Sequence, residues 1–218
     1  MEPNNTPSNN EQRRRPRRRP KKRRGHGCLG FGITLSIVVI ALICVLMFTT
    51  NVLNGPKYKI LSMIYQKHYT TEVEATAKEF DMDENLIYAV IRTESGFDEN
   101  AESHAGAVGL MQLMPDTFSW LQEHKDGQVI YTDEALRIPE INIRYGTYYL
   151  SYLKDLYGDI PTAVAAYNAG ASAVDSWLSD PTYSDDGKTL KKIPYTETEK
   201  YVKKVTHAWD RYQKIYNR

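Results

Sequence analysis

Hydrophobic residues between positions 59 and 216 recur at helical spacing. Leu86, Ile87, Val90 and Ile91 share one face of a segment that Asp83 can cap and that a Ser-Gly pair at 95–96 can end. The same spacing predicts further helices over 59–68, 71–80, 116–121, 140–157, 161–169, 173–178 and 196–216. No segment alternates long enough to require a strand, although 128–132 could pair briefly. The pattern therefore predicts an all-α domain.

The ends of these helices carry recognisable signals. Asp116 is expected to cap a short helix, and Gly158 to end the long one. Thr196, with Glu199 three residues later, fits a capping box for the last helix. The polar stretch 179–192 is expected to be a surface loop.

A different hydrophobic pattern occupies residues 29–50. These 22 residues carry no charge, and as a helix they would extend about 33 Å, enough for a bilayer core of about 30 Å. A cleaved signal peptide is the competing interpretation, but its apolar region is usually shorter and no small-x-small cleavage site follows here. Bulky Ile43 before Cys44 also argues against lipoprotein processing. We expect an uncleaved transmembrane helix over 29–50.

Charge predicts how this helix is oriented. Residues 1–28 contain ten Lys/Arg and two Glu, a net charge of +8, whereas the rest of the chain carries −7. The positively charged N-terminal tail, residues 1–28, should remain in the cytoplasm. Its Pro, Asn and Arg content predicts disorder. The prediction is a single-pass protein of the cell membrane with a linker at 51–57 and an extracytoplasmic domain at 58–218. Topology and anionic headgroups explain the basic tail, so we expect no nucleic-acid partner.

Cysteine and histidine placement limits the chemistry of the outer domain. Cys28 and Cys44 both precede it, which excludes a disulfide framework, a cysteine nucleophile and a cysteine-based metal site there. The five histidines show no HxxxH or similar spacing. We expect neither a metal nor another cofactor.

Glu94 is the first candidate for catalysis. On a helix it lies about 20° from Ile87 and about 40° from Val90, so it continues the apolar face. Apolar surroundings disfavour the charged carboxylate and raise its pKa, as a general acid at neutral pH requires. The alternative is a glutamate at a helix end paired with a nearby Lys or Arg.

The segment 94–118, ESGFDENAESHAGAVGLMQLMPDTF, resembles the motif of soluble-type lytic transglycosylases, which are relatives of goose-type lysozyme. Asn142 and Gly146, followed by Tyr149-Leu150, match the N-x-x-x-G pattern of that family. Two later segments match its A-A-Y-N-A-G and I-P-Y-x-E-T-x-x-Y-V motifs at 165–170 and 193–202. The resemblance implies a lysozyme-like helical fold and peptidoglycan glycan strands as the partner. Whether the protein also has protein partners stays open.

The resemblance also implies roles for particular residues. Glu94 would donate a proton to the MurNAc–GlcNAc bond and then, as a base, close a 1,6-anhydro ring. Six residues would line the glycan groove: Ser103, Gln112, Met114, Tyr167, Asn168 and Glu197.

Simpler interpretations of several motif residues stay open. Met114 and Tyr167 could fill the core, Gly106 and Gly109 could only form a tight turn, and Glu197 could only favour a helix start. Two other functions also stay open. One is a muramidase in which water attacks, and the other is a catalytically silent wall-binding or scaffold module of a secretion or conjugation apparatus.

Overall fold

The computed structural model describes residues 39–47 and 59–217. The predicted basic tail, both ends of the predicted transmembrane segment and the predicted linker lie outside these residues. Residues 39–47 are helical with exposed side chains. Within the described ranges, no helix combines the length and the apolar composition needed to cross a bilayer.

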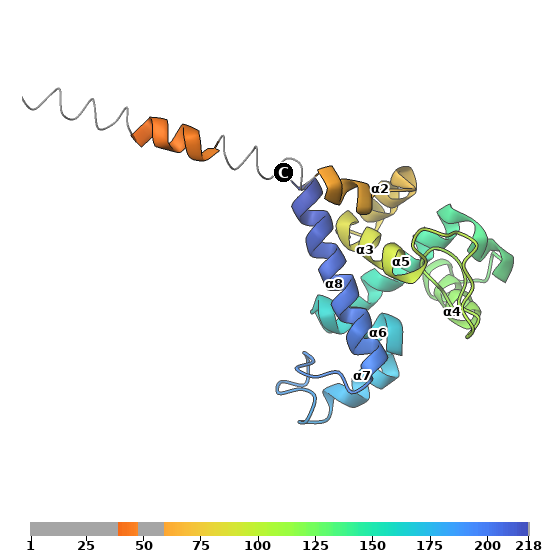
Figure 1. Cartoon of the computed structure of the whole chain (residues 1–218). Coiled ribbons are helices and arrows are strands. Elements are labelled where there is room, and N and C mark those ends of the chain that lie inside the picture. Colours follow the sequence, from red (N-terminus) through yellow and green to blue (C-terminus); the bar gives the residue numbers. More distant parts are fainter. Residues whose placement is uncertain (1–38, 48–58, 218) are drawn as a thin grey trace, which may run out of the picture. The chain divides into compact units, whose positions relative to one another are not determined.

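The chain divides into two compact units, Met1–Asn54 and Gly55–Arg218. The second unit begins with a helical turn at 59–64 and continues through the helices labelled in Figure 1. Their bounds are α2 Thr70–Glu79, α3 Glu84–Glu94, α4 Pro115–Asp126, η1 Asp133–Arg137, α5 Pro139–Tyr157, α6 Ile160–Ala169, α7 Ala171–Leu178 and α8 Thr196–Tyr216. The described residues form no strand, only isolated bridges from Val108 to Glu102 and to Leu113. The predicted all-α class is confirmed.

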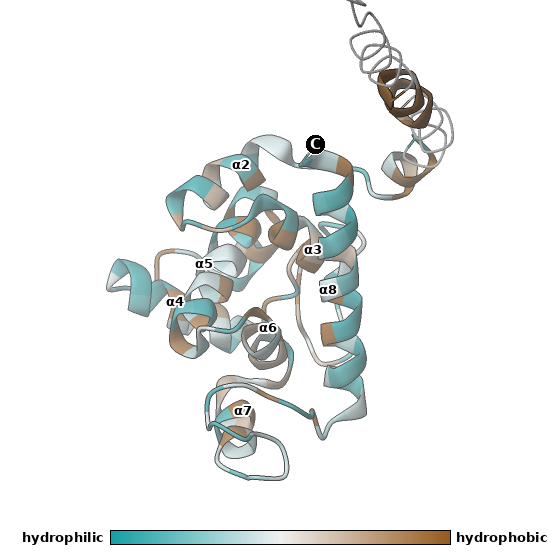
Figure 2. Ribbon diagram, turned by 90° about the vertical axis from the view of Figure 1, so that its left-hand side faces the viewer, coloured by the Kyte–Doolittle hydropathy of each residue, from teal (hydrophilic) through white to brown (hydrophobic). Residues whose placement is uncertain are grey.

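Helix α3 lies at the centre of the second unit. It packs mainly against α8, which also lies along α6, while α5 packs against α2 and α6 (Figure 1). Both α3 and α6 include strongly hydrophobic residues, which are brown in Figure 2. Their residues from Leu86 to Ile91 and from Ala163 to Ala166 are almost fully buried. All the core side chains among the described residues lie between Val73 and Tyr212, within the unit Gly55–Arg218. We therefore expect this unit to fold as an isolated fragment.

Several predicted helix boundaries are confirmed. Asp83 caps α3 by accepting a hydrogen bond from the backbone N–H of Asn85 at 2.8 Å. Gly158 ends α5 in the left-handed conformation, with φ 67°. The loop at 179–192 contains no helix.

Two predicted caps are wrong. Helix α4 begins at Pro115 with Met114 as its cap, because proline suits the first helical position, and Asp116 lies in the first turn. Helix α8 begins at Thr196 with Tyr195 as its cap. The Glu199 side chain pairs with Lys203 rather than closing a capping box.

Other boundaries also differ from the predictions. The first helix ends at 64 rather than 68, and α7 begins two residues earlier than expected. The segment at 128–132 forms no strand, because the Gln122 side chain makes hydrogen bonds to backbone groups that a strand would need for pairing. The Gln122 Oε1 accepts hydrogen bonds from Ile130 N–H and Tyr131 N–H, and its Nε2 donates to the Tyr131 carbonyl.

Candidate active site

Glu94 is the last residue of α3 and faces α8. The Tyr201 hydroxyl donates a hydrogen bond to Glu94 Oε1 at 2.5 Å. Tyr201 is 7% exposed, and Glu94 itself is partly buried. The carboxyl group therefore sits against a helix interface rather than in bulk solvent.

This environment shifts the protonation of Glu94. Burial raises the pKa of its carboxyl from 4.5 to about 7, although the hydrogen bond from Tyr201 acts in the opposite direction by stabilising the carboxylate. Loss of solvation is the larger effect. At neutral pH a substantial fraction of Glu94 is protonated, and it can both donate and accept a proton.

The turn after Glu94 directs the chain into the loop that forms the next part of the site. Gly96 adopts φ 61°, as its predicted place at the helix end requires. The Ser95 hydroxyl lies 2.9 Å from the Leu110 carbonyl oxygen and accepts a hydrogen bond from Phe97 N–H at 3.1 Å. Ser95 thus ties the end of α3 to the loop 101–113.

Asn142, a fully buried residue of α5, fixes the position of that loop through hydrogen bonds to its backbone. Its Oδ1 accepts a hydrogen bond from Met111 N–H at 2.7 Å, and its Nδ2 donates to the carbonyl oxygens of Val108 and Leu136 at 2.9 and 2.8 Å. At Gly109, with φ 82°, a Cβ would lie 2.2 Å from the Leu136 carbonyl oxygen and 2.3 Å from Asn142 Nδ2. The loop can approach α5 this closely only with glycine at that position.

A second close approach involves Gly146, one turn further along α5. A Cβ there would lie 2.5 Å from Met111 Sδ and 2.7 Å from Met111 Cβ. The paired Asn142 and Gly146 of the sequence motif therefore position the loop that carries Gln112 and leads into Met114.

Beside Glu94 lies a cavity of about 450 Å³. The loop, the end of α6 and the start of α8 contribute its walls. Its lining residues are Glu94, Ser103, His104, Ala105, Ala107, Gln112, Met114, Tyr167, Asn168 and Glu197. Met114 is 40% exposed, so its side chain is a surface of this cavity and not a core filler.

Within the described part of the chain, no group of three or more His, Cys, Asp or Glu side chains could hold a metal ion. The nearby Glu99 carboxylate accepts a hydrogen bond from the Tyr69 hydroxyl at 3.1 Å. The side chains that line the cavity offer the carboxyl groups of Glu94 and Glu197, the imidazole of His104, hydroxyls and amides.

The family model described as the transglycosylase SLT domain matches residues 72–190. The chain belongs to this family.

Similar curated proteins are lytic transglycosylases. The soluble lytic murein transglycosylase of Salmonella typhimurium is 36% identical over 141 residues, which cover 61% of this chain and 21% of the relative. The putative soluble enzyme of Haemophilus influenzae is 35% identical over 71% of the chain and 26% of its own length. Membrane-bound lytic murein transglycosylase C of Cronobacter sakazakii is 31% identical over 69% of the chain and 46% of its own length. The chain thus spans about a fifth of the length of the first of these relatives.

Solved structures agree with this assignment. The lytic transglycosylase Slt of Pseudomonas aeruginosa aligns with a TM-score of 0.63 and 34% identity over 72% of this chain and 26% of that one. The 70 kDa soluble lytic transglycosylase of Escherichia coli aligns with a TM-score of 0.63 and 27% identity, over 73% of this chain and 26% of that one. The lysozyme-like helical class expected from the sequence is confirmed.

All seven predicted site residues of the SLT domain line the same cavity. Several of them already have partners in the protein. Gln112, with φ 49°, donates from Nε2 to the carbonyl oxygens of Ala101 and Gly109 at 3.1 and 2.9 Å, so the amide oxygen is the atom left to meet a ligand. The Ser103 hydroxyl accepts a hydrogen bond from Ala107 N–H at 3.0 Å.

The hydroxyl groups of Tyr167 and Tyr201 have different hydrogen-bond partners near Glu94. The Tyr167 hydroxyl donates to the Met111 carbonyl oxygen at 2.9 Å, and burial, together with the nearby negative charge of Glu94, raises its pKa well above 10. Tyr201 makes the direct contact with Glu94. Tyr201 is not among the seven predicted site residues, although the closing I-P-Y-x-E-T-x-x-Y-V motif at 193–202 contains it and could have identified it.

Proposed function

We propose that this SLT domain cleaves peptidoglycan glycan strands as a lytic transglycosylase. The observation that carries the proposal is the carboxyl group of Glu94, which has a pKa of about 7 and lines a cavity with six residues of the family motifs. The names of the similar proteins support murein as the substrate. The 70-kDa soluble lytic transglycosylase solved in complex with bulgecin A is also similar to this chain, with a TM-score of 0.63 and 27% identity.

In the proposed reaction, protonated Glu94 donates its proton to the glycosidic oxygen between MurNAc and GlcNAc. The C1–O bond breaks as the N-acetyl oxygen of MurNAc forms a bond to C1. Glu94, now a carboxylate, then takes the proton from the C6 hydroxyl of the same sugar. The C6 oxygen attacks C1 and displaces the N-acetyl oxygen, which leaves a 1,6-anhydro ring without consuming water.

One carboxyl group suffices for this sequence because it acts first as acid and then as base. A hydrolytic glycosidase normally requires a second carboxylate about 5 to 10 Å from the first. Glu197 lines the same cavity, so a muramidase in which water attacks is the second candidate. The other four groove residues with polar groups, Ser103, Gln112, Tyr167 and Asn168, would position the sugar.

Product analysis tests this proposal. We expect the fragment 55–218 to release fragments with 1,6-anhydro ends from purified peptidoglycan, as identified by mass spectrometry. Glu94→Gln should lower the rate at least 10²-fold, the usual minimum for loss of a general acid–base. Glu123→Gln, which removes the same charge from an exposed position on α4, is the matched control.

Each other result contradicts part of the proposal. Reducing ends would identify a muramidase, and an unchanged rate for Glu94→Gln would remove Glu94 from the chemistry. No cleavage by the unsubstituted fragment would favour a silent wall-binding module.

We further propose that residues 29–50 anchor the protein in the cell membrane, with the N-terminus in the cytoplasm and the SLT domain outside. The absence of charge in 29–50 and the ten preceding Lys/Arg support this topology. The segment 51–56 can reach only about 20 Å when extended. Cleavage would therefore be confined to strands near the membrane, and insertion of a long flexible linker at this segment should spread the cleavage sites through the wall.

A further inference from the structure

The turn at 59–64 presents an apolar surface on the Gly55–Arg218 unit. Ile60, Met63 and Ile64 are 60%, 61% and 50% exposed, and all three lie within one stretch of five residues. A shallow hollow of about 690 Å³ runs beside them, and Tyr65, His207 and Arg211 form its other wall. Scattered exposed apolar residues are ordinary on protein surfaces, but a cluster on one helical turn indicates contact with an apolar partner.

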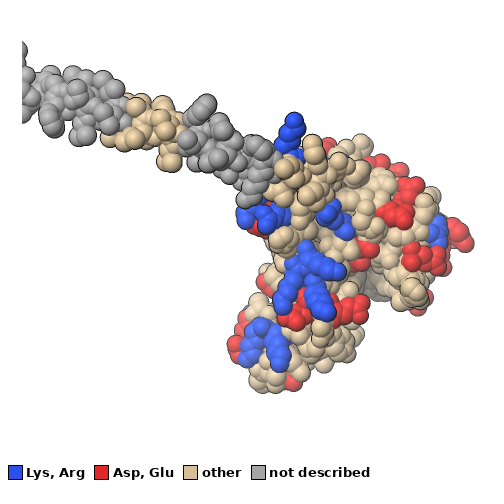
Figure 3. Space-filling view, in the orientation of Figure 1, with Lys and Arg blue, Asp and Glu red and all other residues tan. Residues whose placement is uncertain are grey.

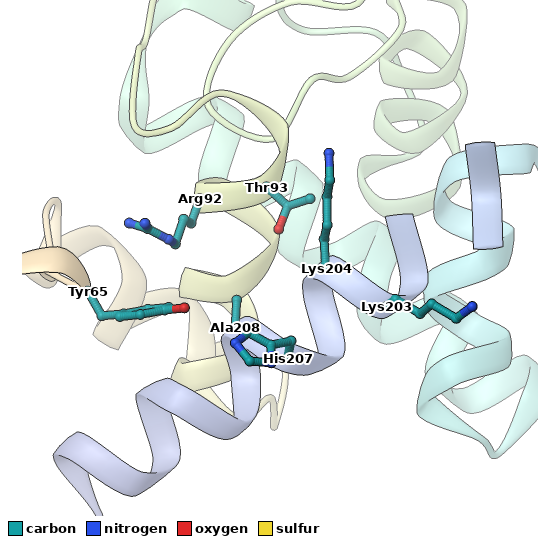
Figure 4. Close-up of a pocket in the computed structure, with 7 residues that line it drawn as sticks. All are labelled: Tyr65, Arg92, Thr93, Lys203, Lys204, His207 and Ala208. Carbon is teal, nitrogen blue, oxygen red and sulfur yellow. The ribbon is translucent and has the colours of Figure 1, made fainter. Parts of the chain in front are cut away.

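Cationic side chains border this apolar surface. A second hollow, of about 530 Å³, lies between α3, α8 and the end of the 59–64 turn (Figure 4). Its lining residues are Tyr65, Arg92, Thr93, Lys203, Lys204, His207 and Ala208. Tyr65 and His207 line both hollows, so the two form one continuous surface. Lys and Arg side chains gather on this face over α8 (Figure 3).

Cationic side chains outnumber carboxylates on this surface, although Asp210 lies close enough to Arg211 and His207 to interact with them electrostatically. Among the described residues, no carboxylate lines either hollow. Lys203 pairs with Glu199 at its edge. Lys204 is exposed and has no ion-pair partner in the described part of the chain. The Arg211 Nε–H donates a hydrogen bond to His207 Nε2 at 3.4 Å. The surface therefore favours an anionic ligand.

Hydrogen bonds hold the apolar and cationic parts together. The Arg92 Nη1 donates to the Ile64 carbonyl oxygen at 2.7 Å, and its guanidinium lies 4.5 Å from the centre of the Tyr65 ring. From α8, the Tyr216 hydroxyl donates to the Tyr65 carbonyl at 2.8 Å. The Tyr212 hydroxyl donates to the Gln66 carbonyl at 3.1 Å. The surface is thus preorganised and loses little freedom when it binds.

We infer that this surface, comprising Ile60, Met63, Ile64, Arg92, Lys203, Lys204 and Arg211, docks on an anionic phospholipid bilayer. Apolar side chains entering the boundary of headgroups and acyl chains, with cations at the phosphates, are the pattern of interfacial membrane binding. An acidic wall polymer would match the cations but not the exposed Ile60, Met63 and Ile64. Residue 59 also follows the charge-free segment 29–50 after only a short stretch of chain.

Docking through this surface would also set how far the active-site cavity lies from the membrane. This consequence rests on the proposed function. Thr93 lines the cationic hollow and Glu94 lines the candidate active site, while Lys204 follows Tyr201 by a single turn of α8. A domain lying on the bilayer through this surface would hold its cavity close to the membrane and would therefore act on the strands nearest to it.

Vesicle sedimentation tests the inference without any cleavage assay. The fragment 55–218 should bind phosphatidylglycerol vesicles and show little binding to phosphatidylcholine vesicles. Changing Lys203, Lys204 and Arg211 to Gln should weaken binding about fivefold for each charge, and about 100-fold together. Ile60→Ser with Met63→Ser should weaken it about tenfold. The control changes Lys78, Lys188 and Lys191, three exposed lysines that line neither hollow, to Gln.

A second measurement uses the whole chain in phosphatidylglycerol vesicles, with Cys28 and Cys44 replaced by Ser. An environment-sensitive fluorophore on Met63→Cys should report an apolar environment, whereas the same label on Lys188→Cys should report water. Equal binding to both lipids, equal loss in the control triple variant, or two labels in water would overturn the inference. Loss of wall cleavage alone would leave the binding result unaffected, so the two proposals fail separately.

Discussion

The raised pKa of Glu94 predicts that this residue makes the folded protein less stable as the pH increases. In the folded state the pKa is about 7, against an ordinary value of 4.5. Between these values the folded protein binds more protons than the unfolded chain, so the free energy of unfolding falls as the pH rises. Below pH 4.5 the carboxyl group is protonated in both states and this penalty vanishes.

The magnitude follows from the two values. One pKa unit corresponds to about 1.4 kcal/mol, so the change from 4.5 to about 7 corresponds to at most about 3 kcal/mol at pH 8. Glutamine fills nearly the same volume but carries no charge at any pH. Glu94→Gln should therefore gain stability relative to the unsubstituted protein between pH 5 and pH 8, by about 1 to 3 kcal/mol.

Urea denaturation of the fragment 55–218 at pH 5 and pH 8 measures this difference. All other titrating groups are common to both proteins, so their contributions cancel in the comparison. Glu123→Gln should show no such gain, because Glu123 is exposed. Parallel pH dependences for Glu94→Gln and the unsubstituted protein would refute the reasoning, since they would mean that the carboxyl group is not disfavoured in its charged form.

Two further substitutions test the surroundings of Glu94. Tyr201→Phe removes a hydrogen bond that stabilises the Glu94 carboxylate, so the pKa of Glu94 should rise. The alkaline limb of the pH profile of kcat/KM should then move to higher pH. A limb at the same pH as in the unsubstituted protein would contradict this. Asn142→Ala leaves three buried backbone groups without their partner and should lower the free energy of unfolding by about 3 kcal/mol in thermal denaturation. The exposed Asn100→Ala should change it by less than about 0.5 kcal/mol, and equal effects would argue against the role of Asn142.

Local signals predicted the fold well where the neighbours in sequence are also the partners in space. Asp83 caps α3 through an N–H only two residues away, so the sequence contains the whole interaction. Thr196 is also a residue type that favours the N-cap position, but Tyr195 takes that position in α8 because of the packing around it. The Tyr195 ring lies edge-on against Trp177 with centroids 4.9 Å apart, and Thr198 is buried.

The site was predictable to the same extent. Helical periodicity placed Glu94 on a buried face, and the motifs identified the residues that line its cavity. Periodicity could not decide which tyrosine meets the carboxyl group, because Tyr167 and Tyr201 lie far from Glu94 in sequence. Only the packing of α3 against α8 brings the Tyr201 hydroxyl to Glu94 and leaves Tyr167 bonded to the Met111 carbonyl.

The most direct measurement is the titration of the Glu94 carboxyl group itself. In the fragment 55–218 with ¹³C-labelled glutamate, the carboxyl resonance that is missing from Glu94→Gln can be followed by NMR as the pH changes. We predict a midpoint at about pH 7. A midpoint near 4.5, with Glu94 fully ionised at neutral pH, would contradict its role as the proton donor.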